Sequence, residues 1–200
     1  ERGLYGDVIE EIDHNVGRLL NHLKATGIAE NTLVIFTSDN GPWLSFGKDG
    51  GSAGALKGGK FSNYEGGIRE PFFVKWPGVV EAGTINETPI IGVDLYPTFL
   101  EMTGATAKDG QVQDGLNLVP LFKGGTLSER SLFWHFPAYL QSYGGKGPFE
   151  QRDPLFRSRP VGVVRHGDWK LMEFFESGDL ELYNLKQDIG ESRNLANTHP

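Results

Sequence analysis

The feature that most constrains the fold is an apolar run at residues 32–37, which follows an amphipathic segment. Within residues 5–24 the apolar side chains recur every three or four positions, which predicts a helix, and Gly27 suits a left-handed helix end. The run at 32–37 is continuously apolar, which favours a strand buried on both faces, as in a parallel sheet. A helix followed by such a strand predicts an α/β layered fold.

The rest of the chain contains two kinds of pattern. A second strand is predicted at residues 72–76, and a short helix at 94–102 with Asp94 as its N-cap and Gly104 at its end. After about residue 125, four short strand candidates follow one another with turn signals between them, which is typical of antiparallel hairpins. These candidates are residues 132–136, 161–165, 170–175 and 180–185, and residues 137–160 are predicted as a long surface loop. We therefore predict an α/β part at residues 1–125 and a small antiparallel β subdomain at residues 126–200.

Composition excludes several classes of protein. The 200 residues contain no cysteine, so the chain has no disulfide, no thiolate metal site and no cysteine nucleophile. Its formal net charge of −7 argues against nucleic acid as a partner. No apolar run approaches the ~20 residues that span a bilayer, so no membrane partner is expected. Because the first residue is Glu1 and no signal segment is visible, we expect a processed product or a fragment.

The first candidate site is the tripeptide Asp39-Asn40-Gly41, directly after the predicted buried strand. In open α/β sheets, ligands bind beyond the carboxyl ends of the strands. A carboxylate beside an amide oxygen offers the hard oxygen ligands that Ca²⁺ or Mg²⁺ prefers. The alternative is a plain turn, because such tripeptides are common turn formers.

The second candidate site is the glycine- and lysine-rich stretch that contains Lys60. Paired glycines at 58–59 and 66–67 permit close approach to a ligand, and a lysine is a compact charge suited to an oxyanion. The alternative is a solvated flexible loop. His135 lies in an aromatic run and either faces a pocket as a substrate-binding residue or packs as an ordinary histidine.

Taken together, the motifs closely resemble the second signature region of sulfatases, the formylglycine-dependent sulfate ester hydrolases of the alkaline-phosphatase-like superfamily. The motifs that carry the resemblance are at residues 32–42, 58–60 and 64–71, with further similarity at 5–27, 93–98, 114–121, 167–171 and 182–185. The resemblance implies part of an alkaline-phosphatase-like layered sheet plus a small C-terminal antiparallel sheet. It also implies hydrolysis of aryl or sugar sulfates by a metal-assisted covalent mechanism.

The resemblance further implies a role for three residues. Asp39 and Asn40 match two ligands of a divalent cation, usually Ca²⁺, and Lys60 matches the catalytic lysine that contacts the sulfate. The string that matures into formylglycine, Cys or Ser followed by x-Pro-x-Arg, is absent, since its nearest match at residues 158–162 fails at the last position. We therefore expect a C-terminal portion of a sulfatase, inactive alone, with an incomplete Ca²⁺ site and the formylglycine in a missing N-terminal part.

Two alternatives remain open at this stage. Relatives in the superfamily cleave phosphoesters or phosphonates, and Lys60 does not distinguish sulfate from phosphate. A non-catalytic glycan-binding module would instead use aromatic side chains as a sugar-binding wall: Trp43, Phe46, Trp134, Phe136, Tyr139 and Tyr143. The expected ligand is a small-molecule or glycan sulfate ester, and self-association through an exposed apolar sheet edge is expected. The family resemblance suggests a periplasmic, secreted or lysosomal location.

Overall fold

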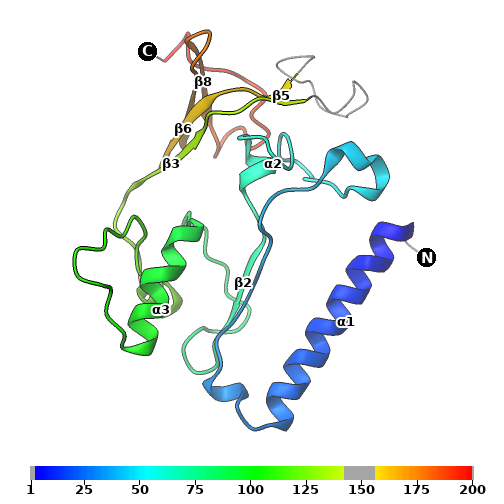
Figure 1. Ribbon diagram of the computed structural model, residues 1–200, viewed down its shortest axis with the longest axis vertical. Helices are drawn as coiled ribbons and strands as arrows, with labels where there is room; N and C mark the ends of the chain where they lie inside the picture. The colour runs from blue at the N-terminus through cyan, green and yellow to red at the C-terminus, as the bar shows by residue number, and fades with distance from the viewer. Residues whose placement is uncertain (1–2, 142–155, 200) are drawn as a thin grey trace. The chain divides into compact units, whose positions relative to one another are not determined.

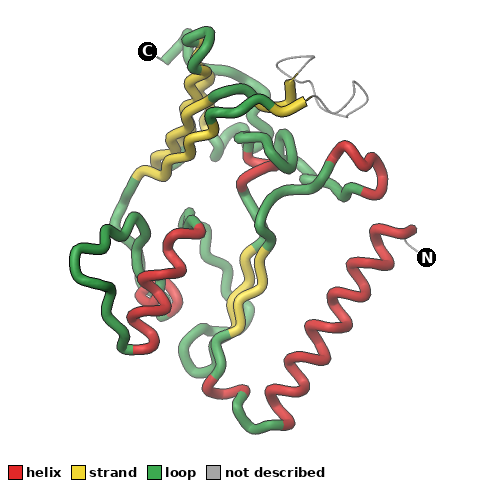
Figure 2. Tube along the Cα trace, in the orientation of Figure 1, coloured by secondary structure: helices red, strands yellow, loops and turns green. Residues whose placement is uncertain are grey.

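The computed structural model describes residues 3–141 and 156–199 (Figure 1). Its elements in chain order are α1 (Gly3–Ala25), η1 (Ala29–Asn31), β1 (Val34–Thr37), η2 (Leu44–Asp49), α2 (Glu65–Ile68), β2 (Phe72–Lys75), η3 (Gly92–Asp94), α3 (Leu95–Thr103), α4 (Val119–Phe122), β3 (Ser131–Phe136), β4 (Leu140–Gln141), β5 (Phe156–Ser158), β6 (Val161–His166), β7 (Trp169–Phe174) and β8 (Asp179–Asn184). Figure 2 shows how much of the path between β1 and β2 is loop. Among the described residues, no helix is both long and apolar enough to cross a membrane.

Helix α1 occupies the segment for which the sequence predicts an amphipathic helix. It ends as predicted next to Gly27, whose φ of +76° is a left-handed conformation that glycine adopts without strain. The Gly27 N–H donates to the Lys24 carbonyl at 3.0 Å, and the Ile28 N–H donates to the Leu23 carbonyl at 3.1 Å. These bonds satisfy carbonyls of the last turn. No residue of α1 is buried, so the apolar face of the helix is largely exposed.

The strands β1 and β2 form a two-stranded sheet. Both strands are therefore confirmed, but the predicted burial of the first strand on both faces is wrong. Val34 and Ile35 are half-buried, while Phe36 and Thr37 are exposed. A central strand is covered only where further strands and helices lie against it. Within the described residues β1 pairs with β2 alone, so one apolar side of it stays open.

The C-terminal strands form a four-stranded antiparallel sheet in the order β3-β6-β7-β8, so the predicted hairpins are confirmed. Alternate side chains of neighbouring strands face the same side, and Val163 lies opposite Met172. The buried members of the core on this sheet are Val161, Val163, Met172, Phe174, Tyr183 and Leu185. This core gives the sheet one apolar face, which the turn after β8 and the loop before α2 help to cover, through Ile189 and Tyr64.

Helix α3 begins beside Asp94 and ends at Gly104, whose φ is +67°. The Asp94 carboxylate does not cap α3 as predicted. It is fully buried and accepts hydrogen bonds from the N–H groups of Ile91 and Leu116, both at 2.9 Å. The correction has a simple cause, because a buried carboxylate is stabilised by two N–H donors more than by one cap. Asp94 thus fixes the segment near residue 116 to the start of the helix.

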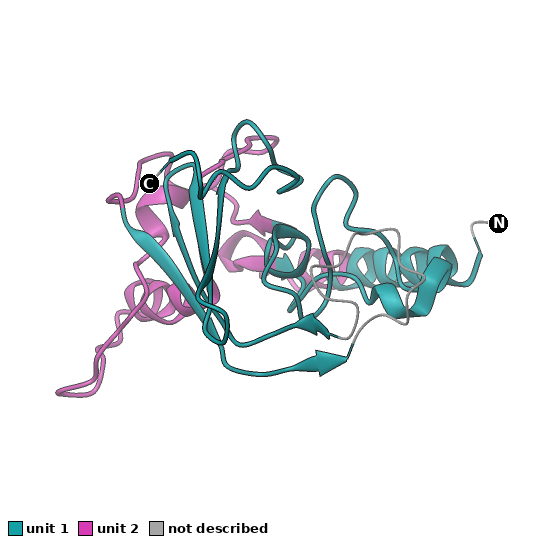
Figure 3. Ribbon diagram, turned by 90° about the horizontal axis from the view of Figure 1, so that it is seen from above, with its two compact units in different colours: residues 1–19, 36–72, 130–200 teal, residues 20–35, 73–129 magenta. Residues whose placement is uncertain are grey.

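The chain divides into two compact units (Figure 3). One consists of residues 1–19, 36–72 and 130–200, and the other of residues 20–35 and 73–129. The first unit contains the turn after β1, the loop that carries Lys60 and the C-terminal sheet. The division at residue 125 inferred from the sequence stays a prediction.

Candidate functional site

The first part of the candidate site is the turn after β1, which presents Asp39 and Asn40. The Ser38 hydroxyl donates to the Asn40 carbonyl at 2.9 Å, which closes the turn locally. The Asp39 side chain is exposed and Asn40 is half-buried. Both polar side chains therefore stand at the carboxyl end of a strand, where ligands of α/β sheets bind.

The second part is the loop that carries Lys60, and it packs directly on the turn after β1. The Lys60 N–H donates to the Pro42 carbonyl at 2.9 Å, and the Gly41 N–H donates to the Gly67 carbonyl at 3.4 Å. A Cβ atom at Gly41 would lie 1.9 Å from the Gly66 carbonyl oxygen, so only glycine permits this approach. The paired glycines therefore bring the Lys60 loop and the Asp39–Asn40 turn together at the level of the backbone.

Aromatic rings surround the Lys60 ammonium. Its Nζ lies 5.5 Å from the centre of the Trp43 ring and 5.3 Å from that of Phe61. Phe61 has a φ of +69°, which an L side chain rarely adopts and which is often found at functional sites. The Arg157 guanidinium lies 5.2 Å from the same Phe61 ring. Arg157 was not predicted from the sequence. It places a second cation beside the Phe61 ring that contacts Lys60.

A second carboxylate, that of Glu70, lies close enough to Asp39 for the two charges to interact. Burial, and then the charge of Asp39, raises the pKa of Glu70 to about 7. The Glu70 Oε1 atom is buried and has no hydrogen-bond partner among the described residues. Two carboxylates, one of them with an unsatisfied oxygen, and the amide oxygen of Asn40 match the hard-oxygen chemistry of Ca²⁺.

The same residues do not complete a cation site. In the part of the chain that the structure describes, no three His, Cys, Asp or Glu side chains converge as metal ligands. Ca²⁺ takes about 6–8 oxygen ligands. The donors around Asp39 and Asn40 therefore fit the cation in kind and fall short of it in number.

His135 and the aromatic residues lie on other parts of the molecule. His135 is exposed on β3, the edge strand of the C-terminal sheet, and its ring centre lies 5.4 Å from that of Phe175. Trp134 and Phe136 pack against the core of that sheet. The exposed pair Trp43 and Phe46 has ring centres 4.3 Å apart, Tyr139 packs on Phe156, and Tyr143 lies outside the described residues. A single aromatic wall is therefore not visible in the described contacts.

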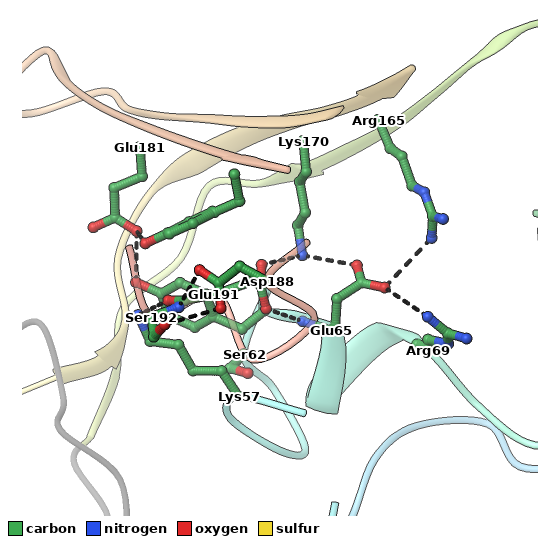
Figure 4. A network of polar contacts seen from close by, with 12 residues as sticks. Lys57, Ser62, Glu65, Arg69, Arg165, Lys170, Glu181, Asp188, Glu191 and Ser192 are labelled. Carbon is green, nitrogen blue, oxygen red and sulfur yellow. Dashed lines mark hydrogen bonds and ion pairs between the residues drawn. The ribbon is translucent and has the colours of Figure 1, made fainter. Parts of the chain in front are cut away.

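A group of buried charges next to the Lys60 loop was also missed by the sequence analysis. It links Glu65 in α2 to Lys170 in β7 and to Glu191 after β8 (Figure 4). Arg69 braces the loop more loosely, with its Nη1 atom 4.0 Å from Glu65 Oε2. Lys57 lies over the Tyr64 ring at 4.1 Å and takes part in this bracing. No local sequence pattern signals the pairs that join Glu65 to Lys170 and Glu191, because more than 100 positions separate them.

The lysine loop packed on a strand-end carboxylate and amide, together with the antiparallel C-terminal sheet, matches the arrangement that the resemblance to alkaline-phosphatase-like hydrolases implied. Comparison with known families agrees with this class. The model of the sulfatase family matches residues 1–105, and that of the C-terminal domain of N-sulphoglucosamine sulphohydrolase matches residues 59–200. The chain belongs to the sulfatase family.

Curated relatives are themselves named sulfatases. A sulfatase of Formosa agariphila is 36% identical over 215 residues, covering 98% of this chain and 36% of the relative. Human N-acetylgalactosamine-6-sulfatase is 42% identical over 136 residues, covering 68% of this chain and 26% of the relative. The chain thus spans about a third or less of the length of these relatives.

Solved structures share the fold. The crystal structure of Ps i-CgsB is 30% identical with a TM-score of 0.79, covering 98% of this chain and 39% of that one. The same protein in complex with k-i-k-neocarrahexaose is 29% identical with a TM-score of 0.76, covering 95% of this chain and 38% of that one. The phosphonate monoester hydrolase SpPMH of Silicibacter pomeroyi is 27% identical with a TM-score of 0.66, covering 94% of this chain and 35% of that one. These neighbours confirm the predicted fold class.

Proposed function

We propose that this chain is the C-terminal portion of a sulfatase that hydrolyses sulfate esters, in which Lys60 contacts the sulfate. The observation that carries the proposal is the packing of the Lys60 loop on the turn after β1. Two backbone contacts join these segments: the Lys60 N–H donates to the Pro42 carbonyl at 2.9 Å, and Gly41 approaches Gly66 closely. They hold the residue that carries the ammonium next to the turn that carries Asp39 and Asn40.

The residues of this chain would act on the sulfate mainly by electrostatics. A positioned ammonium stabilises the negative charge that develops on the transferred group and on the leaving oxygen. The rings of Trp43 and Phe61 lie within 6 Å of the Lys60 Nζ and attract it by cation–π interaction. Arg157, which contacts the same Phe61 ring, would add a second positive charge for an anionic substrate.

We further propose that Asp39 and Asn40 hold a divalent cation, Ca²⁺ by family resemblance, together with ligands from outside these residues. When bound, the cation supplies Lewis-acid polarisation of the sulfate oxygens. The unsatisfied Glu70 Oε1 beside Asp39 supports a positive charge at this place.

The nucleophile would come from outside the 200 residues. The family resemblance implies a formylglycine made from a Cys or Ser that is followed by x-Pro-x-Arg. This sequence lacks that motif. We propose that the isolated chain therefore has no turnover, and that activity belongs to a polypeptide completed to the length of the relatives.

The substrate class and the location follow from the relatives as proposals. Ps i-CgsB was solved in complex with k-i-k-neocarrahexaose, and this likeness supports a glycan sulfate ester as the substrate here. The likeness to SpPMH supports phosphonate ester hydrolysis as a second candidate function, since an ammonium binds either oxyanion. A periplasmic, secreted or lysosomal location is proposed from the family resemblance.

The test is to assay the completed polypeptide on an aryl sulfate, an aryl phosphate and an aryl phosphonate ester. We expect the aryl sulfate to be hydrolysed fastest and a Ca²⁺ chelator to lower the rate. Lys60→Met should lower kcat by about 10²–10³-fold, the usual loss when one transition-state donor is removed. The exposed Lys48 gives the matched control, because Lys48→Met removes the same charge from the same region. Preferred hydrolysis of the phosphonate, or equal losses in the two variants, would contradict the proposal.

A further inference from the structure

Three charged side chains are buried together against the Lys60 loop. Lys170, Glu65 and Glu191 are exposed by 0%, 1% and 0%. The Lys170 Nζ lies 3.1 Å from Glu65 Oε1 and 2.8 Å from Glu191 Oε1 (Figure 4). Buried charges are costly unless they are paired, so one ammonium holds two carboxylates in a single place.

The two carboxylates differ in the other charges that they face. Glu65 also faces Arg165, whose Nη1 lies 3.4 Å from Glu65 Oε2, and the more distant Arg69. Glu191 accepts the Glu65 N–H at 2.6 Å and has Lys170 as its ion-pair partner. Lys170 is therefore the cation that offsets the charge of Glu191.

Glu191 holds both ends of the segment that contains Lys60. At one end, the Lys57 Nζ donates to the Glu191 carbonyl at 3.2 Å. At the other end, the Glu65 N–H donates to Glu191 Oε2. The Gly66 N–H also donates to the Lys57 carbonyl at 2.7 Å, which closes the segment on itself. Movement of Glu191 would thus change the path of the backbone on both sides of Lys60.

The turn after β8 presents Glu191 in a fixed conformation. Its φ is +49°, in the left-handed region that non-glycine residues rarely adopt. The Asp188 carboxylate accepts the N–H groups of Ser192 and Arg193, both at 2.8 Å, and the Glu191 N–H donates to the Asp188 carbonyl. A strained residue held by its neighbours is pre-organised for the contact that it makes.

We propose that Lys170 is a positioning residue for Lys60: by pairing with Glu65 and Glu191 at once, it fixes the loop that carries Lys60 on the C-terminal sheet. The inference rests on the proposed function of Lys60 as the sulfate contact. Lys170 acts from β7 through two glutamates, and the same loop packs on the turn that presents Asp39 and Asn40. The C-terminal sheet thereby becomes part of the support of the site.

If Lys170 acts by pairing with the two glutamates, the effect of Lys170→Met on the loop should depend on pH. A loss of packing alone would not depend on pH. Burial raises the pKa of Glu191, while Lys170 lowers it, so Lys170→Met would raise it further. In that variant the ionised Glu191 carboxylate lies buried beside Glu65 without its cation, and protonation of Glu191 as the pH falls removes the repulsion. The native loop is then favoured as the pH falls.

The remaining titratable groups around Glu191 do not supply this pH dependence. Burial raises the pKa of Tyr64 and of Tyr183 far above neutral pH, so both phenols stay neutral. Lys57 donates to the Glu191 carbonyl, and Asp188 is held by its own turn. Protonation of Glu191 is therefore the event that restores the contact.

The first measurement is kcat of the completed polypeptide on an aryl sulfate between pH 6 and pH 8. Lys170→Met should lower kcat by about 10²-fold at pH 8, because a small displacement of a catalytic group costs that much, and by less at pH 6. Adding Glu191→Gln removes the repulsion and keeps an acceptor for the Glu65 N–H, so the double variant should recover activity at pH 8. Lys186→Met is the control, since Lys186 is 77% exposed on the same unit.

The second measurement is amide hydrogen exchange of the 200-residue chain, which needs no activity. Lys170→Met should accelerate exchange of the Lys60 and Gly66 amides at pH 8, the double variant should restore protection, and the amides of α3 should be unchanged. If this pattern holds but the completed polypeptide does not hydrolyse sulfate, the proposed function fails and the positioning role stands. Unchanged exchange, a pH-independent loss of kcat, or loss of protection throughout the molecule without recovery in the double variant would overturn the positioning role.

Discussion

At the scale of single residues, the position that the structure constrains most is Gly41. Its missing side chain leaves room for the Gly66 carbonyl oxygen, which would lie 1.9 Å from a Cβ atom. We predict that Gly41→Ala destabilises the chain by about 1–3 kcal/mol, the usual cost of overpacking, because the loop with Lys60 must move away. Urea unfolding followed by circular dichroism measures this loss.

The control for this prediction is Gly17→Ala in α1. A Cβ atom there meets nothing within 4 Å, and alanine favours a helix over glycine by about 1 kcal/mol. The two variants make the same chemical change and should move stability in opposite directions. If Gly41→Ala were neutral, the close packing of the strand-end turn on the loop would be wrong.

The sequence alone identified four candidate site residues and missed the side chains that support three of them. Asp39, Asn40 and Lys60 could be found because they stand beside a readable strand and paired glycines. Glu65 and Lys170 could not, since 105 positions separate them and each is an ordinary charged residue in its own segment. The same holds for Arg157, whose contact with Phe61 depends on how β5 folds back. The roles of Asp39, Asn40, Lys60 and His135 stay predictions.

At the scale of elements, Asp94 connects α3 to the segment that follows it. Its carboxylate accepts two N–H groups, and the Thr98 hydroxyl accepts the Leu118 N–H at 2.8 Å. We predict that Asp94→Ala costs about 1–3 kcal/mol for each N–H group left buried without a partner. Asp94→Asn keeps one acceptor and should cost less.

Thermal unfolding monitored by circular dichroism checks this order. Asp109→Ala is the matched control, since Asp109 is exposed in a turn of the same unit and should leave the midpoint nearly unchanged. A loss for Asp94→Ala no larger than that of the control would show that the two hydrogen bonds contribute nothing.

The elements themselves were largely predictable because each carries its own local signal. Strands β3, β6, β7 and β8 follow from short apolar segments with turn residues between them, and the end of α1 follows from Gly27. Strands β4 and β5 were not predicted, because they lie within residues 137–160, which read as a loop. The burial of β1 was predicted wrongly, because burial depends on what lies against a strand and not on its own composition. The cap role of Asp94 was wrong for a similar reason, since Leu116 lies 22 positions away.

At the scale of the whole molecule, the described residues expose many large apolar side chains on helices and strands. The exposed side chains on α1 include Val8 at 45%, Ile9 at 46% and Ile12 at 42%. On β1, Phe36 is 43% exposed. Apolar faces on regular elements gain free energy when another surface covers them, by roughly 25 cal/mol per Å².

We therefore predict that the purified 200-residue chain self-associates, and that the apolar face of α1 contributes to the contact. Ile12→Glu places a charge on that face and should shift the chain toward the monomer, as measured by size-exclusion chromatography with light scattering. His14→Glu is the control, because residue 14 lies about 200° around the helix from residue 12 and the variant adds the same charge to the polar face. A wild-type chain that elutes as a monomer at high concentration, or two variants that shift equally, would contradict the prediction, since neither outcome requires the apolar face of α1.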